Sequence, residues 1–332
     1  MKLTIIGGGS WGTALAIVLA ARFDDLALWV YETDLAARLR ATRENDVYLP
    51  GLELPANVQV TSDLGDALRQ SQIVLGVMPS RHARRIYAAA LPFIDPSMTF
   101  VSATKGIEQK TLLRISQVMS QVMSPVLGEA KIAVLSGPTF AREIARGEPA
   151  AVVVASENLT VAEHIQRAFS GPTFRLYTNT DPVGVEIGAA LKNVIAIGAG
   201  VCQGLELGSN ALAALITRGL AEITRLAVAM GGQPKTLAGL AGLGDLVLTC
   251  SGELSRNRKV GLELAKGRTL AEIVGSTPMV AEGIETCDAA VALGERFHVD
   301  LPIVQQMHQV LHLAKSPKDA LRDLMERSLK GE

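Results

Sequence analysis

A glycine-rich loop between a short apolar run and a helical pattern constrains the fold of this chain more than any other feature. Residues 3–6 predict a strand, and the loop Gly7–Gly12 follows directly, before a run of small residues typical of a helix. Gly7, Gly9 and Gly12 match G-x-G-x-x-G, whose glycines permit a tight turn, a backbone approach to a pyrophosphate and close helix packing. The loop therefore predicts a dinucleotide site at a helix N-terminus. The alternative is a glycine-rich turn that binds no ligand.

An acidic residue stands where the second strand of such a unit should end. Residues 26–30 form the next apolar run, and Glu32 follows it, about 20 positions after the loop. Its carboxylate is suited to accept hydrogen bonds from ribose hydroxyls and to repel a 2′-phosphate, which favours NAD over NADP. A solvated charge at a strand end is the alternative, so the predicted cofactor is NAD or NADP.

The first half of the chain alternates strand-like and helix-like segments, which predicts a doubly wound, Rossmann-type α/β sheet. The continuous apolar runs are typical of parallel strands covered on both faces. Helical composition lies between them, for example over 81–90 and 111–123. The six runs are residues 3–6, 26–30, 73–77, 99–103, 132–135 and 151–155.

The second half predicts an all-helical domain. Asp181-Pro182 combines a capping residue with a proline suited to the first helical position, and no strand-like alternation follows it. We therefore predict a dinucleotide-binding domain over 1–180 and a helical substrate-binding domain over 181–332. Ser209-Asn210 is expected to cap a helix that runs to Met230, with Glu222 and Arg225 on one face. Residues 317–329 predict one more amphipathic helix.

Composition excludes several classes of protein. The 332 residues suit two domains, and a formal net charge of −1 provides no global positive field for nucleic acid or an anionic membrane. No uninterrupted apolar stretch reaches the length of a membrane span. Glycines interrupt the N-terminal apolar run, which is therefore too short for the apolar region of a signal peptide. The three cysteines, Cys202, Cys250 and Cys287, form no C-x-x-C pair and suit a reducing compartment. We expect a cytoplasmic protein.

Five longer segments, together with GGGSWGTALA at the N-terminus, carry a resemblance to a known family. The segments are SATKGIE (102–108), SGPTFARE (136–143), ALKNVIAIGAG (190–200), AGLGDLVLTC (241–250) and SRNRKVG (255–261). With them the chain resembles the bacterial NAD(P)-dependent glycerol-3-phosphate dehydrogenases from end to end. The resemblance implies hydride transfer between dihydroxyacetone phosphate and sn-glycerol 3-phosphate, a role in phospholipid synthesis and a homodimer.

Lys192 is the candidate catalytic residue. Oxidation of a secondary alcohol requires a base for the hydroxyl proton, and the reverse reaction requires an acid. Lys192 stands in an otherwise apolar helical pattern, where burial would lower its pKa toward neutral pH. A surface lysine that extends its ammonium to water is the alternative. The resemblance assigns Lys192 as proton acceptor and as a substrate ligand.

The remaining substrate contacts are candidates from three other segments. Lys105 follows a predicted strand at the edge where doubly wound sheets bind ligands, and the resemblance places it at both substrate and cofactor. Ser255, Arg256 and Asn257 supply a hydroxyl, a guanidinium and an amide for a phosphate, and the resemblance brings Arg256 to the cofactor as well. An ordinary loop lysine and a capped helix with a basic face are the alternatives. The resemblance adds three further substrate ligands: Gly137, Thr139 and Asp245.

Asp245, Thr139 and the other motif residues also have plain structural alternatives. Asp245 would hydrogen-bond a substrate hydroxyl or orient Lys192, unless it is a turn aspartate. Thr139 would be a helix cap in an ordinary turn. On the cofactor side the alternatives are a packing role for Trp11 and Tyr48 and a surface position for Glu282. The resemblance implies these cofactor contacts: Ser10, Trp11, Tyr48, Ala141, Val280 and Glu282.

Two expectations limit the hypothesis. Many family members carry Arg or His at the end of the second strand, whereas this chain has Tyr31-Glu32, which weakens a strict NADP preference. His308 and His312 share a helix face, but no Cys or acidic partner in the sequence completes a set, so no metal is predicted. The competing hypotheses are a non-catalytic dinucleotide sensor and a dehydrogenase for another small hydroxy acid.

Overall fold

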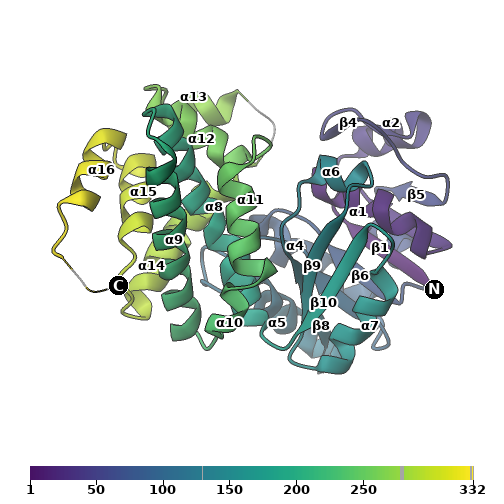
Figure 1. Ribbon diagram of the computed structural model, residues 1–332. Helices are drawn as coiled ribbons and strands as arrows, with labels where there is room; N and C mark the ends of the chain where they lie inside the picture. Colours follow the sequence, from purple (N-terminus) through teal and green to yellow (C-terminus); the bar gives the residue numbers. More distant parts are fainter. Residues whose placement is uncertain (129, 277–279, 330, 332) are drawn as a thin grey trace.

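The computed structural model describes residues 1–128, 130–276, 280–329 and 331. Figure 1 shows a β-sheet with flanking helices in purple to teal beside a group of helices in green to yellow. The sheet strands, in spatial order, are β10 (Phe174–Asn179), β9 (Ala150–Ala155), β8 (Lys131–Ser136), β7 (Thr99–Ser102), β6 (Ile73–Gly76), β1 (Lys2–Ile6), β2 (Asp25–Trp29) and β5 (Val58–Thr61). A separate pair is formed by β3 (Glu44–Asn45) and β4 (Leu49–Glu53).

The helices fall into two sets along the chain. Those beside the sheet are α1 (Ser10–Leu19), α2 (Thr33–Thr42), α3 (Leu64–Leu68), α4 (Ala83–Ala90), α5 (Ile115–Leu127), α6 (Ala141–Ala145) and α7 (Leu159–Phe169). Those of the second set are α8 (Pro182–Gly204), α9 (Ser209–Ala229), α10 (Pro234–Leu237), α11 (Asp245–Ser251), α12 (Arg256–Ala265), α13 (Leu270–Gly275), α14 (Glu282–Arg296), α15 (Pro302–His312) and α16 (Pro317–Met325). Short 3-10 turns are η1 (Ala20–Arg22), η2 (Ser80–His82) and η3 (Leu91–Phe93), and η4 (Leu240–Gly244) is a π-helical turn.

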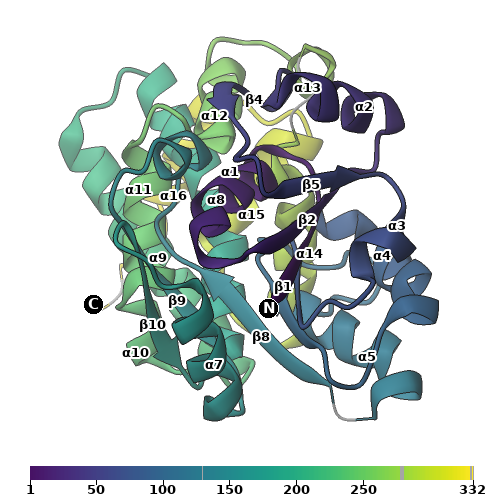
Figure 2. The same ribbon diagram turned by 90° about the vertical axis from the view of Figure 1, so that its right-hand side faces the viewer.

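All six strands expected from apolar runs are present, but one of them has the opposite direction. Strand β9 pairs antiparallel with β8, while β1, β2, β5, β6, β7 and β8 pair in parallel. The expectation of parallel strands throughout is therefore wrong at residues 151–155. The reason is the connection: α6 has only five residues, about 7 Å of helix, which is too short to return along a six-residue strand. Figure 2 shows the resulting sheet.

The sequence reasoning missed β5, β10 and the β3–β4 pair because none is a continuous apolar run. Strands β5 and β10 alternate buried and more exposed residues, as in VQVT and FRLYTN, since each lies at an edge of the sheet. Strands β1, β6 and β7 lie in the centre and are almost entirely buried, which explains their uniform apolar composition.

The second set of helices packs around α8. From Pro182 onward the described residues form helices and no strand, as expected. Asp181 caps α8, because its side chain accepts a hydrogen bond from the N–H of Gly184 at 2.8 Å. Helix α8 is long and apolar enough to cross a membrane, but 94% of that apolar window is buried inside the protein. It is therefore the core helix of this domain.

The N-cap of α9 and the surroundings of its Glu222 differ from what the sequence predicts. Gly208, without a side-chain hydrogen bond, is the N-cap of α9, so the predicted Ser209-Asn210 cap is wrong. Glu222 of α9 is buried and accepts hydrogen bonds from the N–H groups of Ile303 and Val304. Its carboxylate thus satisfies the first turn of α15. Burial raises the pKa of Glu222 to about 7.

Helices α8 and α12 approach so closely that only glycine fits at their crossing. A Cβ atom on Gly200 would lie 1.9 Å from the carbonyl oxygen of Arg258, and one on Gly261 would lie 1.8 Å from that of Ile197. Any larger residue at either position would force the helices apart. This crossing brings the first turn of α12 beside the middle of α8.

Candidate active site

The glycine loop joins β1 to α1 in a conformation that two of its glycines require. Gly7 has φ +128°, and a Cβ atom there would lie 2.6 Å from the carbonyl oxygen of Val77. A Cβ atom on Gly12 would lie 1.9 Å from the carbonyl oxygen of Gly7, so α1 packs directly against the loop. The predicted strand, loop and helix are confirmed here, with the steric reasons expected for the first and last glycines.

Gly9 and Trp11 indicate where a ligand fits against this loop. Gly9 is the N-cap of α1 with no side-chain cap, and a Cβ atom on it would meet nothing within 4 Å. Ser10, the first residue of α1, is half-buried beside it. Trp11 packs against the hydrophobic core of the sheet domain, yet its indole Nε1 is buried without a hydrogen-bond partner among the described residues. The loop thus presents an open helix N-terminus and an unsatisfied donor, which suits a polar, anionic group.

Glu32 and Tyr48 lie together beyond the end of β2. The Tyr48 hydroxyl donates to Glu32 Oε1 at 3.2 Å. Glu32 is exposed, and the ring of Tyr48 packs against the hydrophobic core of the sheet domain, so the alternatives of a solvated charge and a packing aromatic stay open. Burial, followed by the charge of Glu32, raises the pKa of Tyr48, which keeps the phenol protonated as a donor. Tyr48 belongs to the loop between β3 and β4, an element that sequence reasoning did not predict.

Lys192, Asp245 and Lys105 form a charged cluster between the two domains. Asp245 is completely buried, and its Oδ1 accepts from Lys192 Nζ while its Oδ2 accepts from Lys105 Nζ at 2.9 Å. Lys192 is 5% exposed, so the alternative of a surface lysine is wrong. Burial lowers the pKa of Lys192 to about 7, Asp245 acts in the opposite direction, and Lys105 lowers it further.

Thr249 completes this cluster, and sequence reasoning missed it. Its hydroxyl donates to the carbonyl oxygen of Asp245 at 2.6 Å, so its oxygen is left to accept from Lys192 Nζ at 2.8 Å. The signal was its spacing four residues after Asp245 in a helix, which places both on one face. Asp245 itself directly follows the π-helical turn η4, an irregularity that is frequent at functional sites.

The loop after β8 contacts the same cluster through Lys105. Lys105 Nζ donates to the carbonyl oxygen of Gly137 at 3.0 Å and to Thr139 Oγ1 at 3.4 Å. Phe140, not Thr139, occupies the N-cap of α6, so the alternative of Thr139 as a helix cap is wrong. Ala141 is the first residue of α6 and is half-buried.

The first turn of α12 brings three predicted residues to the cluster. Ser255 caps the helix by accepting from the N–H of Arg258 at 3.2 Å. The Asn257 amide donates to Asn193 Oδ1 at 2.9 Å, and Asn193 directly follows Lys192. Arg256 is exposed and makes no hydrogen bond or ion pair to any described residue. Desolvation by the surrounding protein lowers the pKa of Arg256, and the charge of Glu282 acts in the opposite direction.

Glu282 joins the two domains. Its carboxylate accepts from the N–H of Ser80 at 3.2 Å and from Ser80 Oγ at 2.7 Å. It is half-buried, and burial raises its pKa, so the alternative of a surface acid is wrong. Val280 lies two residues earlier, half-buried, in the loop before α14.

The histidine pair has an acidic partner that the sequence did not reveal. Asp288 of α14 lies 3.3 Å from His308 Nε2 and 3.1 Å from His312 Nε2 through one oxygen, so the expected lack of an acidic neighbour is wrong. Nevertheless, among residues 1–128, 130–276 and 280–329, no group of three or more His, Cys, Asp or Glu side chains is placed to hold a metal ion.

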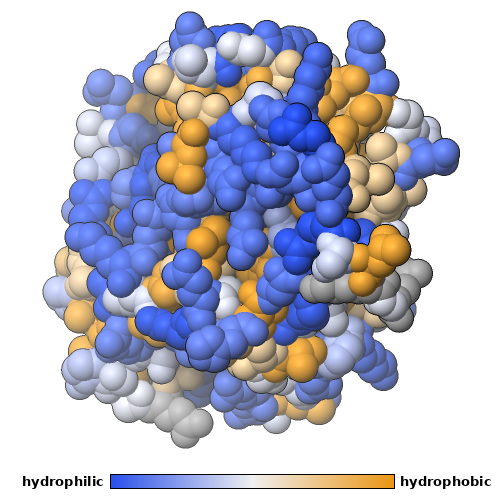
Figure 3. All heavy atoms as spheres, turned by 90° about the vertical axis from the view of Figure 1, so that its left-hand side faces the viewer, coloured by the Kyte–Doolittle hydropathy of each residue, from blue (hydrophilic) through white to orange (hydrophobic). Residues whose placement is uncertain are grey.

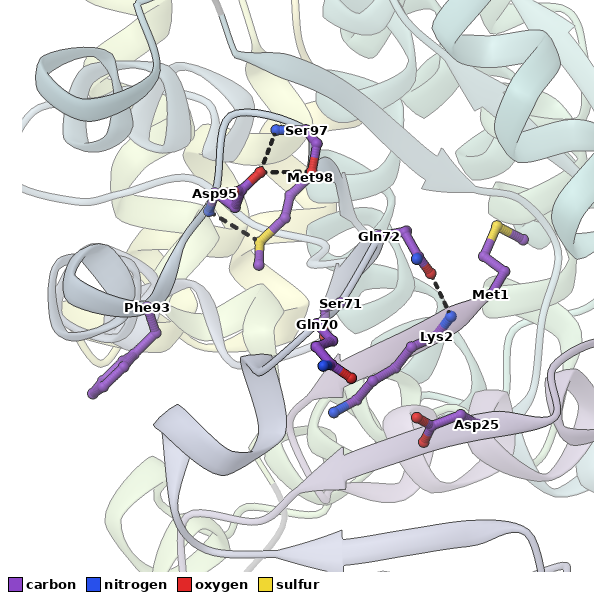
Figure 4. Close-up of a pocket in the computed structure, with 10 residues that line it drawn as sticks. All are labelled: Met1, Lys2, Asp25, Gln70, Ser71, Gln72, Phe93, Asp95, Ser97 and Met98. Carbon is purple, nitrogen blue, oxygen red and sulfur yellow. Dashed lines mark hydrogen bonds between the residues drawn. The ribbon is translucent and has the colours of Figure 1, made fainter.

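A hollow of about 650 Å³ lies at the opposite end of the sheet (Figure 4). Lys2, Asp25 and Gln72 line it, near the amino ends of β1, β2 and β6. Lys2 Nζ there donates to the carbonyl oxygen of Arg69. Because parallel sheets bind ligands at the carboxyl ends of their strands, this hollow is separate from the cofactor site.

The fold and these residues define a class of protein: a dehydrogenase with a Rossmann-type dinucleotide domain and a helical domain that carries a buried lysine. The chain matches the family model described as NAD-dependent glycerol-3-phosphate dehydrogenase N-terminus over residues 2–162, and the one described as its C-terminus over 181–322. It therefore belongs to the NAD-dependent glycerol-3-phosphate dehydrogenase family, and the predicted resemblance is confirmed.

Individual relatives agree over the whole chain. The chain is 56% identical to a glycerol-3-phosphate dehydrogenase (NAD(P)+) of Koribacter versatilis over 328 residues, 98% of this chain and 97% of the relative. A similarly named protein of Citrifermentans bemidjiense is 50% identical over 331 residues, covering 100% and 98%. The crystal structure of glycerol-3-phosphate dehydrogenase from Coxiella burnetii has a TM-score of 0.94 at 39% identity and covers 98% and 99%. The chain is thus an NAD(P)-dependent oxidoreductase of glycerol 3-phosphate.

Proposed function

We propose that Lys192 exchanges the proton of the substrate hydroxyl in this glycerol-3-phosphate dehydrogenase. The observation that carries the assignment is one buried carboxylate, Asp245, held between two lysines. With both lysines charged the cluster would bear a net positive charge in a buried site, so the more deeply buried Lys192 is the one that loses its proton.

The contacts of Lys192 also set the direction of its reactive lone pair. A neutral amine has two N–H bonds, and the structure provides two acceptors, Asp245 Oδ1 and Thr249 Oγ1. When both N–H bonds of Lys192 are engaged in this way, the direction of its lone pair is fixed, and the lone pair can accept the proton of a substrate hydroxyl. After the proton is taken, the ammonium can donate it back to a ketone oxygen in the reverse reaction.

The bound nicotinamide cofactor supplies the hydride acceptor for the alcohol or the hydride donor for the ketone. We propose that Gly7, Gly9, Ser10, Trp11 and Gly12 hold its phosphates and that Glu32 and Tyr48 hold its adenosine ribose. The open N-cap and the orphan indole donor at this loop support the fit. The remaining proposed cofactor contacts are Lys105, Ala141, Arg256, Val280 and Glu282.

We propose that the substrate phosphate binds to the first turn of α12. Arg256 makes no hydrogen bond or ion pair with another described residue and stands at the N-terminus of a ten-residue helix, where donors and the helix dipole favour an anion. Ser255 and Asn257 lie on either side of it. Lys105, Gly137 and Thr139 would contact the three-carbon part of the substrate, beside Asp245.

Cofactor oxidation followed by absorbance tests this assignment. Purified chain with dihydroxyacetone phosphate should oxidise NADH or NADPH, and Arg256→Ala should raise the KM for the substrate about 100-fold, as loss of a charge-assisted contact would. Dihydroxyacetone without phosphate should be a poor substrate for the parent and the variant alike. Equal KM values in parent and variant would refute the phosphate assignment.

We further propose a division into a dinucleotide domain over 1–180 and a helical domain over 181–332, and a cytoplasmic homodimer that supplies glycerol 3-phosphate for phospholipid synthesis. The change from sheet to helices near Asp181 supports the division. Free thiols at Cys202, Cys250 and Cys287 support a reducing compartment. In Figure 3 the far face of the helical domain is mainly hydrophilic, with hydrophobic residues in separate groups. Light scattering of the purified chain measures the oligomeric state.

A further inference from the structure

A buried asparagine connects the glycine loop to the predicted ribose-binding carboxylate. Asn45 of β3 is 0% exposed. Its amide nitrogen donates to the carbonyl oxygen of Gly8 and to Thr13 Oγ1, both at 2.8 Å. Its side-chain oxygen accepts from the N–H of Tyr48 at 3.0 Å. The side chain of Asn45 thus makes all three of these hydrogen bonds to protein atoms, so it holds Tyr48 at a defined position relative to the glycine loop.

Tyr48 in turn restrains Glu32. The phenol donates to Oε1 of Glu32 at 3.2 Å, and no hydrogen bond or ion pair engages Oε2 within the part of the chain that the structure describes. Glu32 is exposed, so without Tyr48 its carboxylate would sample many rotamers. The restraint leaves one oxygen free as an acceptor next to the dinucleotide loop.

From this chain of contacts we propose that Asn45 and Tyr48 are positioning residues that hold Glu32 at the cofactor ribose and thereby make NADH the preferred cofactor over NADPH. The inference rests on the proposed role of Glu32. A fixed carboxylate accepts hydrogen bonds from the free 2′- and 3′-hydroxyls of NADH. It repels a 2′-phosphate, which carries about two negative charges at neutral pH. A mobile carboxylate would turn away and relieve much of that repulsion.

One nearby cation acts in the opposite direction. The guanidinium of Arg85 lies over the ring of Tyr31, with its central carbon 5.1 Å from the ring centroid, and is exposed. It also approaches the Tyr31 hydroxyl at 3.5 Å. Arg85 forms no ion pair with a carboxylate in the part of the chain that the structure describes, so it is the group that would attract a 2′-phosphate. The preference therefore depends on Glu32 being held in place against Arg85.

Binding without substrate tests the inference independently of turnover. Isothermal titration calorimetry of the full chain should give a Kd for NADH at least tenfold below that for NADPH. Glu32→Gln should reduce this ratio about tenfold, and Tyr48→Phe, which removes one hydrogen bond to a charged group, about fivefold. The double variant Glu32→Gln/Tyr48→Phe should have the same ratio of Kd values as Glu32→Gln alone, because Tyr48 acts on the ratio through the carboxylate of Glu32.

The matched control is Tyr177→Phe, which removes a hydroxyl from an exposed tyrosine on edge strand β10 and should leave both Kd values unchanged. Asn45→Ala should reduce the preference for NADH over NADPH, measured as the ratio of the two Kd values, as Tyr48→Phe does. If that variant does not fold, the Tyr48 series decides alone.

Three results would overturn the proposal: a parent that binds NADPH as tightly as NADH, a Tyr48→Phe variant that weakens both cofactors equally, or a double variant whose effects on the ratio add. Equal parental affinities would overturn this proposal and leave the proposed cofactor site standing. Failure to bind either cofactor would overturn the proposed cofactor site as well.

Discussion

The glycine loop and the lysine–aspartate cluster are proposed as two halves of one site, yet they are built in different ways. The loop occupies consecutive residues, and two of its glycines, Gly7 and Gly12, are required by backbone contacts with Val77, directly after β6, and with the loop itself. The cluster assembles Lys105, Lys192 and Asp245, of which Asp245 lies 140 and 53 residues after the two lysines. The loop acts through backbone geometry, and the cluster acts through burial and charge.

This difference shows which kind of function is local. A backbone conformation that binds phosphate needs only a short motif between a strand and a helix. A lysine with a pKa of about 7 needs a buried position and a second cation, which together outweigh the opposing effect of the carboxylate. Substitutions in the loop should therefore change cofactor binding, whereas substitutions in the cluster should change turnover.

The largest expected effect separates the two halves directly. Lys192→Met retains side-chain length but removes the amine, and should reduce turnover by about 10³- to 10⁴-fold, the typical contribution of a general base together with its electrostatic effect. Steady-state rates with dihydroxyacetone phosphate measure the loss. The Kd of NADH should stay within about twofold, since Lys192 is not among the proposed cofactor contacts. A variant with substantial turnover would refute the assignment of Lys192.

A glycine pair sharpens the cofactor side of the comparison. Gly12→Ala places a methyl group 1.9 Å from the carbonyl oxygen of Gly7, which should cost about 1–3 kcal/mol of folding stability and most of the cofactor affinity. Gly9→Ala meets no protein atom within 4 Å, so its melting temperature should match that of the parent while cofactor affinity falls about tenfold or more. Thermal melts and NADH titrations measure both. Unchanged affinity in Gly9→Ala would argue against a close approach of the pyrophosphate.

The pH dependence reports on the cluster alone. Because burial lowers the pKa of Lys192 to about 7, the lysine is protonated below that pH and neutral above it. Oxidation of glycerol 3-phosphate needs the neutral amine, so its kcat/KM should rise about tenfold per pH unit below 7 and level off above. Ketone reduction needs the ammonium and should decline above 7. NADH binding without substrate should show no such midpoint, and a midpoint near 10 would contradict a buried base.

The smallest expected effect concerns Thr249. Thr249→Val keeps the shape of the side chain and removes the acceptor for Lys192 Nζ, so turnover should fall about fivefold to tenfold. Thr160→Val on α7, an exposed threonine far from the cluster, is the matched control and should have normal kinetics. A Thr249→Val variant with parental kcat would show that Asp245 alone positions the lysine.

Much of this architecture was predictable because it depends on contacts and patterns among neighbouring residues. Uniform apolar runs predicted the central strands, and Asp181-Pro182 predicted the start of α8, since capping is a contact between neighbouring residues. The edge strands β5 and β10 were not predicted because about half of their residues are not buried, so they form no continuous apolar run. The reversed direction of β9 escaped because it depends on the length of α6.

The sequence by itself determined the strand, glycine loop and helix at the N-terminus and the helical second half, and through resemblance it predicted the candidate residues of the site. Only the tertiary structure decided how those residues act. It placed Asp245 between two lysines, added Thr249 as the second acceptor for Lys192, and joined Gly8 to Glu32 through Asn45 and Tyr48. The physical reason is that burial and long-range electrostatics depend on distances set by packing, which no spacing along the chain specifies.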